Sequence, residues 1–177
     1  MEAIMREEII SENLLKDYYQ IFSNPQTLKD FFSYYEALVR FVKKHPVEFT
    51  DEVKDEWGLN ELLDININEY IVANPDICLD MEAKRLVRDY ESIDTLAMSI
   101  RDTLWDMVTI YSGKDCPITP NDELRYIKIK YADDSERLLL ECAGCGWTED
   151  VEGNEYEGPF GRVFPVNKDD LEKYIDL

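Results

Sequence analysis

The apolar residues between Asp80 and Gly113 constrain the fold most, because they recur at alternating four- and three-residue intervals. That spacing predicts one continuous helical face. The residues of this face are Leu86, Tyr90, Ile93, Ala97, Ile100, Leu104, Met107 and Tyr111. Asp80 can cap the first turn, and Gly113 can follow the last one. We therefore predict a helix over 80–113 as the central post of a helical subdomain.

Shorter helices are predicted before this long one. Their apolar residues also follow helical spacing, and His45-Pro46 ends the second of them because the residue before a proline disfavours helix. Thr50 can cap the third. The predicted helices cover 2–22, 25–44, 51–57 and, as one or two helices, 60–73.

The sequence pattern changes after Gly113. Residues 124–131 and 137–142 favour strands, and the turn residues between them predict an antiparallel hairpin. Further strands are predicted at 147–151 and 161–166, followed by a short helix at 168–175. The expected fold class is α+β: an N-terminal helical bundle around one long helix (1–113), then a small antiparallel β-sheet and a short C-terminal helix (114–177), packed as one globular unit.

Charge is the strongest global property of the sequence. The 177 residues contain 39 acids and 19 bases, which gives a formal net charge of −20. This balance argues against binding to nucleic acid or to anionic membranes through a basic surface. The expected partner is a basic protein, although strong acidity also serves solubility alone.

Two acidic stretches contain large aromatic residues. Rings provide anchoring area at protein interfaces, while carboxylates steer and pair with Arg or Lys. The first stretch lies within 48–80, where ten acids accompany the single base Lys54. The candidate partner-binding residues are Asp51, Glu52, Asp55, Glu56, Trp57 and Glu61 in the first stretch, and Trp147, Glu149, Asp150, Glu152, Glu155, Tyr156 and Glu157 in the second.

The sequence Cys142-Ala-Gly-Cys145-Gly at the end of a predicted strand has the spacing of a zinc-knuckle half-site. A structural zinc needs four ligands, and a second Cys-X-X-Cys does not occur in the sequence. Completion would require Cys116 and Cys78, or the single histidine His45. A thioredoxin-like redox role fits less well, because strand-like sequence follows the glycines. We expect no bound metal or cofactor, and we interpret Cys142 and Cys145 as two half-buried thiols at a strand end. The alternative is that these two cysteines bind zinc.

The sequence contains no motif that names a reaction. Phosphate-binding, dinucleotide-binding and nucleophile-elbow patterns are missing from it, and the acids of 149–157 do not have calcium-loop spacing. We therefore expect a protein that is not an enzyme. The acidic N-terminal segment lacks signal-peptide character, no window is apolar enough for a membrane span, and four scattered cysteines suggest reduced thiols, so a cytoplasmic protein is expected.

The chain resembles bacterial immunity proteins, the small inhibitors that neutralise secreted or contact-delivered toxins. The resemblance lies in its size, its acidity, its helix-plus-sheet organisation and the stretch LLLECAGCGWT (138–148) leading to GRVFP (161–165). It implies an antitoxin without catalysis or cofactor that covers a basic toxin domain such as a nuclease. The alternatives are a zinc-stabilised adaptor centred on Cys142 and Cys145, and a nucleic-acid mimic that acts on a DNA-binding protein.

Overall fold

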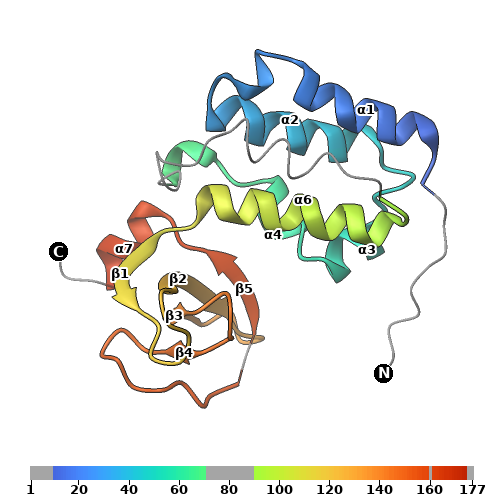
Figure 1. Cartoon of the computed structure of the whole chain (residues 1–177). Coiled ribbons are helices and arrows are strands. Elements are labelled where there is room, and N and C mark those ends of the chain that lie inside the picture. The colour runs from blue at the N-terminus through green and yellow to red at the C-terminus, as the bar shows by residue number, and fades with distance from the viewer. Residues whose placement is uncertain (1–9, 71–89, 160, 175–177) are drawn as a thin grey trace. The chain divides into compact units, whose positions relative to one another are not determined.

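The computed structural model describes residues 10–70, 90–159 and 161–174 (Figure 1). The chain forms two compact units. The described part of the first comprises 10–65 and 90–107, and that of the second comprises 66–70, 108–159 and 161–174. Helices and an antiparallel sheet are both present, which confirms the α+β class. None of the helices in the described ranges combines the length and the apolar character needed to cross a membrane.

Helices make up the first unit. Their bounds are α1 (Glu12–Ser23), α2 (Phe31–Lys44), α3 (Asp51–Glu56), α4 (Asn60–Leu63) and α6 (Ile93–Val108), with a short 3-10 turn at Thr27–Lys29. The first residues of α1, α2 and α3 are held by side-chain caps from Ser11, Asp30 and Thr50. Each cap accepts a hydrogen bond from a backbone N–H that has no partner inside its helix.

Tyrosine and phenylalanine side chains form much of the core of the first unit. The ring of Tyr18 packs edge-on against Phe22 and Tyr90 and tilted against Phe41, with centroid distances of 5.0, 5.7 and 5.3 Å. Helices α1 and α2, which carry most of these rings, lie side by side in Figure 1. The aromatic doublets of the sequence therefore serve mainly core packing, as the burial of Tyr18, Tyr34 and Tyr35 shows.

The helix predicted over 80–113 is shorter in the structure, where residues 90–92 precede it and residues 109–113 follow it. Helix α6 begins at Ile93, after Ser92, whose hydroxyl accepts a hydrogen bond from Thr95 N–H at 3.2 Å. It ends at Val108, and the chain then enters a strand that contains Gly113. Residues 80–89 lie outside the described part of the chain. The apolar periodicity did identify core residues, since those from Tyr90 to Met107 are buried.

Two earlier helices are also shorter than predicted. Helix α1 begins at Glu12 rather than near position 2, and residues 1–9 lie outside the described chain. Helix α2 begins at Phe31 rather than at position 25, because Asp30 adopts an extended conformation and caps it after the 3-10 turn. The short helix predicted after Thr50 is confirmed as α3.

The second unit contains an antiparallel sheet. Its strands are β1 (Tyr111–Asp115), β2 (Glu123–Lys130), β3 (Glu136–Glu141), β4 (Thr148–Glu149) and β5 (Arg162–Pro165), followed by α7 (Lys168–Tyr174). The order is β1-β2-β3-β4, and β5 pairs with β2 beyond the end of β1. The predicted β2–β3 hairpin is confirmed, with Arg125 opposite Glu141 and Lys130 opposite Glu136. Strand β1 was not predicted.

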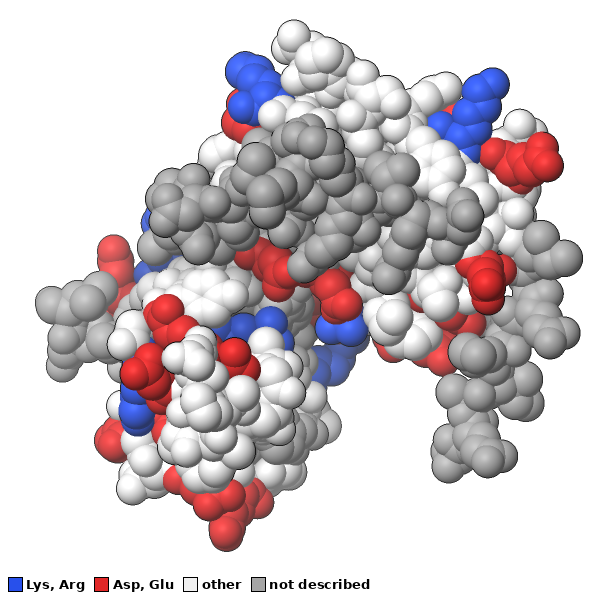
Figure 2. Space-filling model, in the orientation of Figure 1, with Lys and Arg blue, Asp and Glu red and all other residues white. Residues whose placement is uncertain are grey.

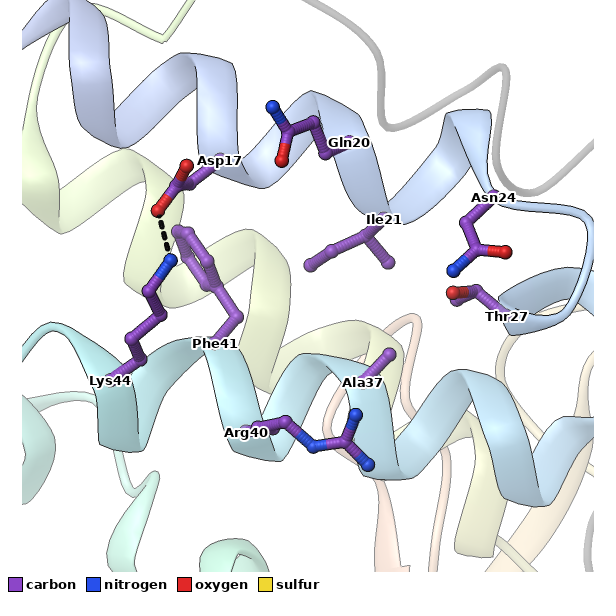
Figure 3. Close-up of a pocket in the computed structure, with 9 residues that line it drawn as sticks. All are labelled: Asp17, Gln20, Ile21, Asn24, Thr27, Ala37, Arg40, Phe41 and Lys44. Carbon is purple, nitrogen blue, oxygen red and sulfur yellow. Dashed lines mark hydrogen bonds and ion pairs between the residues drawn. The ribbon is translucent and has the colours of Figure 1, made fainter.

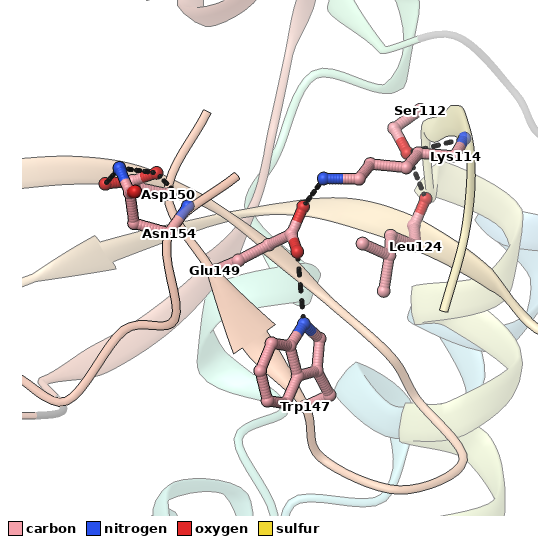
Figure 4. A network of polar contacts seen from close by, with 7 residues as sticks. All are labelled: Ser112, Lys114, Leu124, Trp147, Glu149, Asp150 and Asn154. Atoms are coloured by element: carbon pink, nitrogen blue, oxygen red, sulfur yellow. Dashed lines mark hydrogen bonds and ion pairs between the residues drawn. The ribbon is translucent and has the colours of Figure 1, made fainter. Parts of the chain in front are cut away.

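Two ion pairs connect distant parts of this second unit. Lys114 on β1 contacts Glu149 on β4, so the strands at the two ends of the order β1-β2-β3-β4 meet (Figure 4). Lys128 on β2 donates to both carboxylate oxygens of Asp170 on α7, at 2.9 Å each. The sheet is therefore strongly curled, and the last helix is held to its central strand.

Candidate functional site

Three cysteine sulfurs converge at one end of the sheet. Cys116 directly follows β1, Cys142 directly follows β3, and Cys145 lies in the turn before β4. Because β1 and β3 both pair with β2, their ends come together. The three sulfurs lie within 4.8 Å of one another, and Cys116 Sγ is 3.6 Å from Cys145 Sγ.

Backbone N–H groups point at two of these sulfurs, from the turn after Cys116 and from the turn after Cys142. Cys116 Sγ accepts from Ile118 N–H at 3.4 Å and from Thr119 N–H at 3.3 Å. Cys142 Sγ accepts from the N–H groups of Gly144 and Cys145. The two turns therefore share one pattern, in which a cysteine accepts from the second and third residues after it. Such turns orient amide dipoles toward sulfur and favour the thiolate form.

The cysteine environments differ in their effect on ionisation. Burial is the main influence on Cys142 and raises the pKa of its thiol. The pKa of exposed Cys145 is lowered to about 7, first by a hydrogen bond from the Thr119 hydroxyl and next by the Trp147 N–H. Cys145 is therefore the sulfur that ionises most readily of these two.

A small apolar cluster supports the three sulfurs. Cys116 and Cys142 are buried with Leu124 and Leu140, and the rings of Tyr126 and Trp147 pack against this group. The turn after Cys142 is closed by Gly146 N–H to Cys142 O at 2.9 Å and by Cys142 N–H to Trp147 O at 2.8 Å. These contacts fix the turn after Cys142, and the apolar cluster limits the access of water to Cys116 and Cys142.

Zinc coordination fits this arrangement. A tetrahedral zinc with Zn–S distances of about 2.3 Å places its sulfurs about 3.8 Å apart. The Cys116–Cys145 separation of 3.6 Å is close to that value, and it is far longer than a disulfide bond of about 2.05 Å. The three described cysteines are accordingly free thiols. Thiolate ligands also select zinc over magnesium or calcium.

The spacing of Cys142 and Cys145 predicted a half-site, with Cys116 as one completing ligand, and the structure brings these three together. Cys78, the second candidate, lies outside the described residues. His45 belongs to the first unit, where it ends α2 and its Nε2 lies 3.2 Å from Asp17 Oδ2. One sequence signal could have pointed to Cys116. Cys116-Pro-Ile-Thr119 matches Cys142-Ala-Gly-Cys145 in length and first residue, and threonine replaces the second cysteine.

The first predicted acidic surface is largely present on α3. We call Asp51, Glu52, Asp55 and Glu56 the α3 acidic surface; all four are exposed. Asp51 pairs with Lys54 at 2.7 Å, and Lys54 lowers the pKa of Asp51 through that hydrogen bond. Trp57 and Glu61, predicted with this surface, are half-buried. The indole N–H of Trp57 donates to buried Asp94 at 3.0 Å, so its polar atom serves the fold.

The second predicted surface changes in composition. Glu149 is only 2% exposed, contacts Lys114, and accepts the Trp147 indole N–H at 3.1 Å (Figure 4). Its assignment to an exposed binding surface is therefore wrong, because the buried carboxylate contacts Lys114 of β1 and the Trp147 indole. Asp150 is half-buried and accepts the backbone N–H of Asn154 at 2.8 Å, which lowers its pKa.

The remaining residues of that stretch lie nearer the solvent. Glu152, Glu155 and Glu157 are exposed, and we call these three the 152–157 acidic surface. Tyr156 is half-buried, with its hydroxyl 2.5 Å from that of Tyr131 and the guanidinium of Arg137 5.0 Å from its ring centroid. On the face in Figure 2, acidic side chains lie in several groups separated by uncharged atoms.

Two cavities are lined in part by charged or thiol side chains. The first, about 190 Å³ in volume, is lined by residues of α1 and α2, among them Ile21 and Phe41 and the ion pair of Asp17 with Lys44 at 2.5 Å (Figure 3). The second, about 240 Å³, directly adjoins the cysteine site. Its lining residues are Ile118, Cys145, Gly146, Trp147, Thr148, Glu155 and Tyr156. The second cavity therefore places apolar side chains and an exposed acid beside Cys145.

Comparisons with known proteins identify no relative of this chain: no protein-family model, curated protein or solved structure matches it.

Proposed function

We propose that this chain is a zinc-stabilised protein-interaction module. The observation that carries the proposal is the convergence of the Cys116, Cys142 and Cys145 sulfurs within 4.8 Å, with the first two buried and the third exposed. Zinc held there joins the end of β1 to the turn between β3 and β4. A sheet of this size has a small hydrophobic core, which stabilises the fold only in part. Bound zinc would add to that stability, because the free energy of zinc binding becomes free energy of folding.

The interaction surface of this module is the cavity beside Cys145. Ile118 is 61% exposed at its edge, and Trp147 and Tyr156 supply half-buried rings. Glu155 adds a carboxylate, so the cavity suits a side chain with an apolar stem and a cationic end, such as Arg or Lys. Zinc fixes both turns that form this cavity.

Metal analysis of the purified full chain tests the proposal. We expect one zinc per chain, lost on treatment with a strong chelator and recovered when zinc alone is added back. Hydrogen exchange of β1–β4 amides should accelerate after chelation, while α1 and α2 amides of the first unit serve as the internal reference. A chain that takes up no stoichiometric zinc when fully reduced contradicts the proposal.

A second candidate function is inhibition of a basic protein toxin, in line with the resemblance to immunity proteins. The observation that favours it is the exposure of four acids on α3 and three at 152–157 in a chain of net charge −20. The proposed inhibitor is cytoplasmic, binds neither nucleic acid nor membrane, and covers the toxin without catalysis.

Salt dependence tests this second function. Association with a basic nuclease toxin domain should slow by at least about tenfold between low and high salt, because screening removes electrostatic steering. Replacing Asp51, Glu52, Asp55 and Glu56 by their amides should reduce both the association rate and its salt dependence. Replacing the same number of acids elsewhere, such as Glu12, Glu36, Asp64 and Asp102, is the matched control. Equal effects of the two sets would show that α3 does not steer the partner.

A further inference from the structure

The turn after Cys116 has the geometry of a zinc knuckle that lacks its second cysteine. Cys116 accepts from the N–H groups two and three residues later, as Cys142 does. Thr119 therefore occupies the position that corresponds to Cys145. Its hydroxyl reaches Cys145 Sγ, so the side chain faces the cluster. Among the described residues the site has three sulfurs, because threonine stands where a fourth ligand is expected.

A carboxylate lies beside one of the three sulfurs. Asp122 Oδ2 is 3.6 Å from Cys142 Sγ, but the carboxylate is not within 4.8 Å of all three sulfurs, so it has to turn toward Cys116 and Cys145 to complete a site. The backbone carbonyl of Asp122 accepts the Cys116 N–H at 2.7 Å, which fixes this residue beside the first turn. A Cβ atom built on Gly144 would overlap the Asp122 carboxylate, so glycine at this position permits the approach. Asn121, with φ of 68°, reverses the chain just before Asp122.

We propose that Asp122 supplies the fourth ligand of the zinc site, giving three sulfurs and one carboxylate oxygen. This inference rests on the proposed zinc function and specifies its coordination. Carboxylate is an established zinc ligand, whereas a neutral threonine hydroxyl is not among the usual ones. Asp122 also keeps four anionic ligands around the dication, as four cysteines would. The shell is then closed, and a closed shell assigns the zinc a structural role.

X-ray absorption on the zinc-loaded full chain measures the coordination directly. We expect three sulfurs at about 2.3 Å and one oxygen at about 2.0–2.2 Å. Asp122→Asn should lower zinc affinity by at least about tenfold in competition with a chromophoric chelator. Asp115→Asn is the matched control, because it removes one negative charge next to Cys116 from an exposed side chain. It should change the affinity by less than about twofold, since exposed charges are screened.

Two further variants separate ligation from a general effect on folding. Gly144→Ala changes no ligand but displaces the Asp122 carboxylate, so its affinity should fall toward that of Asp122→Asn. Thr119→Cys completes the first knuckle, so absorption should report four sulfurs and the affinity should rise. In the Thr119→Cys background, Asp122→Asn should lose its effect, because the cysteine has replaced the carboxylate.

Each alternative result is distinct. A wild-type chain without zinc overturns the proposed function itself. Zinc bound by four sulfurs, with affinity lost in Cys78→Ser, identifies Cys78 as the fourth ligand and overturns the Asp122 proposal. Zinc bound by three sulfurs and an oxygen that persists in Asp122→Asn at unchanged affinity assigns the oxygen to water or Thr119, and it overturns the proposal as well.

Discussion

Replacing Cys142 by serine is expected to abolish stoichiometric zinc binding and, with it, the zinc-dependent part of the stability of the second unit. Cys142 is fully buried, and its sulfur lies within 4.8 Å of the other two. A serine hydroxyl stays protonated at neutral pH and is a poor zinc ligand, so two sulfurs remain. At free zinc about 1,000 times the dissociation constant, binding to the folded chain alone contributes about 4 kcal/mol. That increment should be missing in the variant.

The measurement compares unfolding with zinc and with chelator for each protein. Cys142→Ser also alters packing beside Leu124 and Leu140, and this loss should appear equally in both conditions. Only the difference between conditions reports zinc. Cys145→Ser, at an exposed position, should remove the same increment with little packing cost. If Cys145→Ser kept the full zinc-dependent gain in stability, the three-sulfur site would be incorrect.

Replacing Lys128 by methionine is expected to destabilise the second unit by about 3 kcal/mol. The side chains of Lys128 and Asp170 are only 16% and 11% exposed, and Lys128 Nζ lies 2.9 Å from Asp170 Oδ1. Removing one partner of a buried pair leaves an uncompensated charge, which typically costs about 3–5 kcal/mol. The lower end applies because both side chains retain some contact with water.

Asp170 gives this variant further effects. Its backbone N–H donates to Asn167 Oδ1 at 2.8 Å, and its carboxylate accepts the Asn167 N–H at 3.2 Å, so Asn167 caps α7 and Asp170 completes the capping box. Burial raises the pKa of Tyr70 to about 12, with the Asp170 charge as the second cause. Loss of Lys128 leaves the Asp170 charge uncompensated beside the start of α7 and the Tyr70 hydroxyl.

Lys130→Met is the matched control on the same strand. Lys130 pairs with Asp134 at 3.1 Å, but these side chains are 41% and 85% exposed, so the pair is worth at most about 1 kcal/mol. Because the chain has two units, hydrogen exchange of β2 amides reports the second unit better than a single global transition does. Equal protection in the two variants would show that the Lys128–Asp170 pair does not stabilise the unit.

Local sequence signals predicted the parts of the fold that local chemistry determines. The Thr50 cap and the turn residues between β2 and β3 act over a few positions, and both elements were predicted. The long helix was misjudged because helical spacing of apolar residues continues across Ser92 and past Val108. Tyr111 continues the apolar spacing but lies on β1 and is 47% exposed, so the periodicity did not mark the end of the helix.

The cysteine site was only partly predictable for a different reason. Cys142 and Cys145 are neighbours in the sequence, but Cys116 reaches them only through the pairing of β1, β2 and β3. Strand β1 was missed, since Ser112, Gly113 and Lys114 have weak strand preference. The same omission hid the partner of Glu149, and a carboxylate that is buried was therefore assigned to a binding surface.

The contact of Lys114 with Glu149 also affects how the sheet meets other molecules. Strands at the ends of an open sheet offer unpaired N–H and C=O groups that can recruit a strand from another chain. Here the end strands β1 and β4 are drawn toward each other, and a charged side chain lies along β1. This curl works against aggregation through those two strands. The net charge repels other chains only at long range, whereas the curl acts at the strand edges themselves.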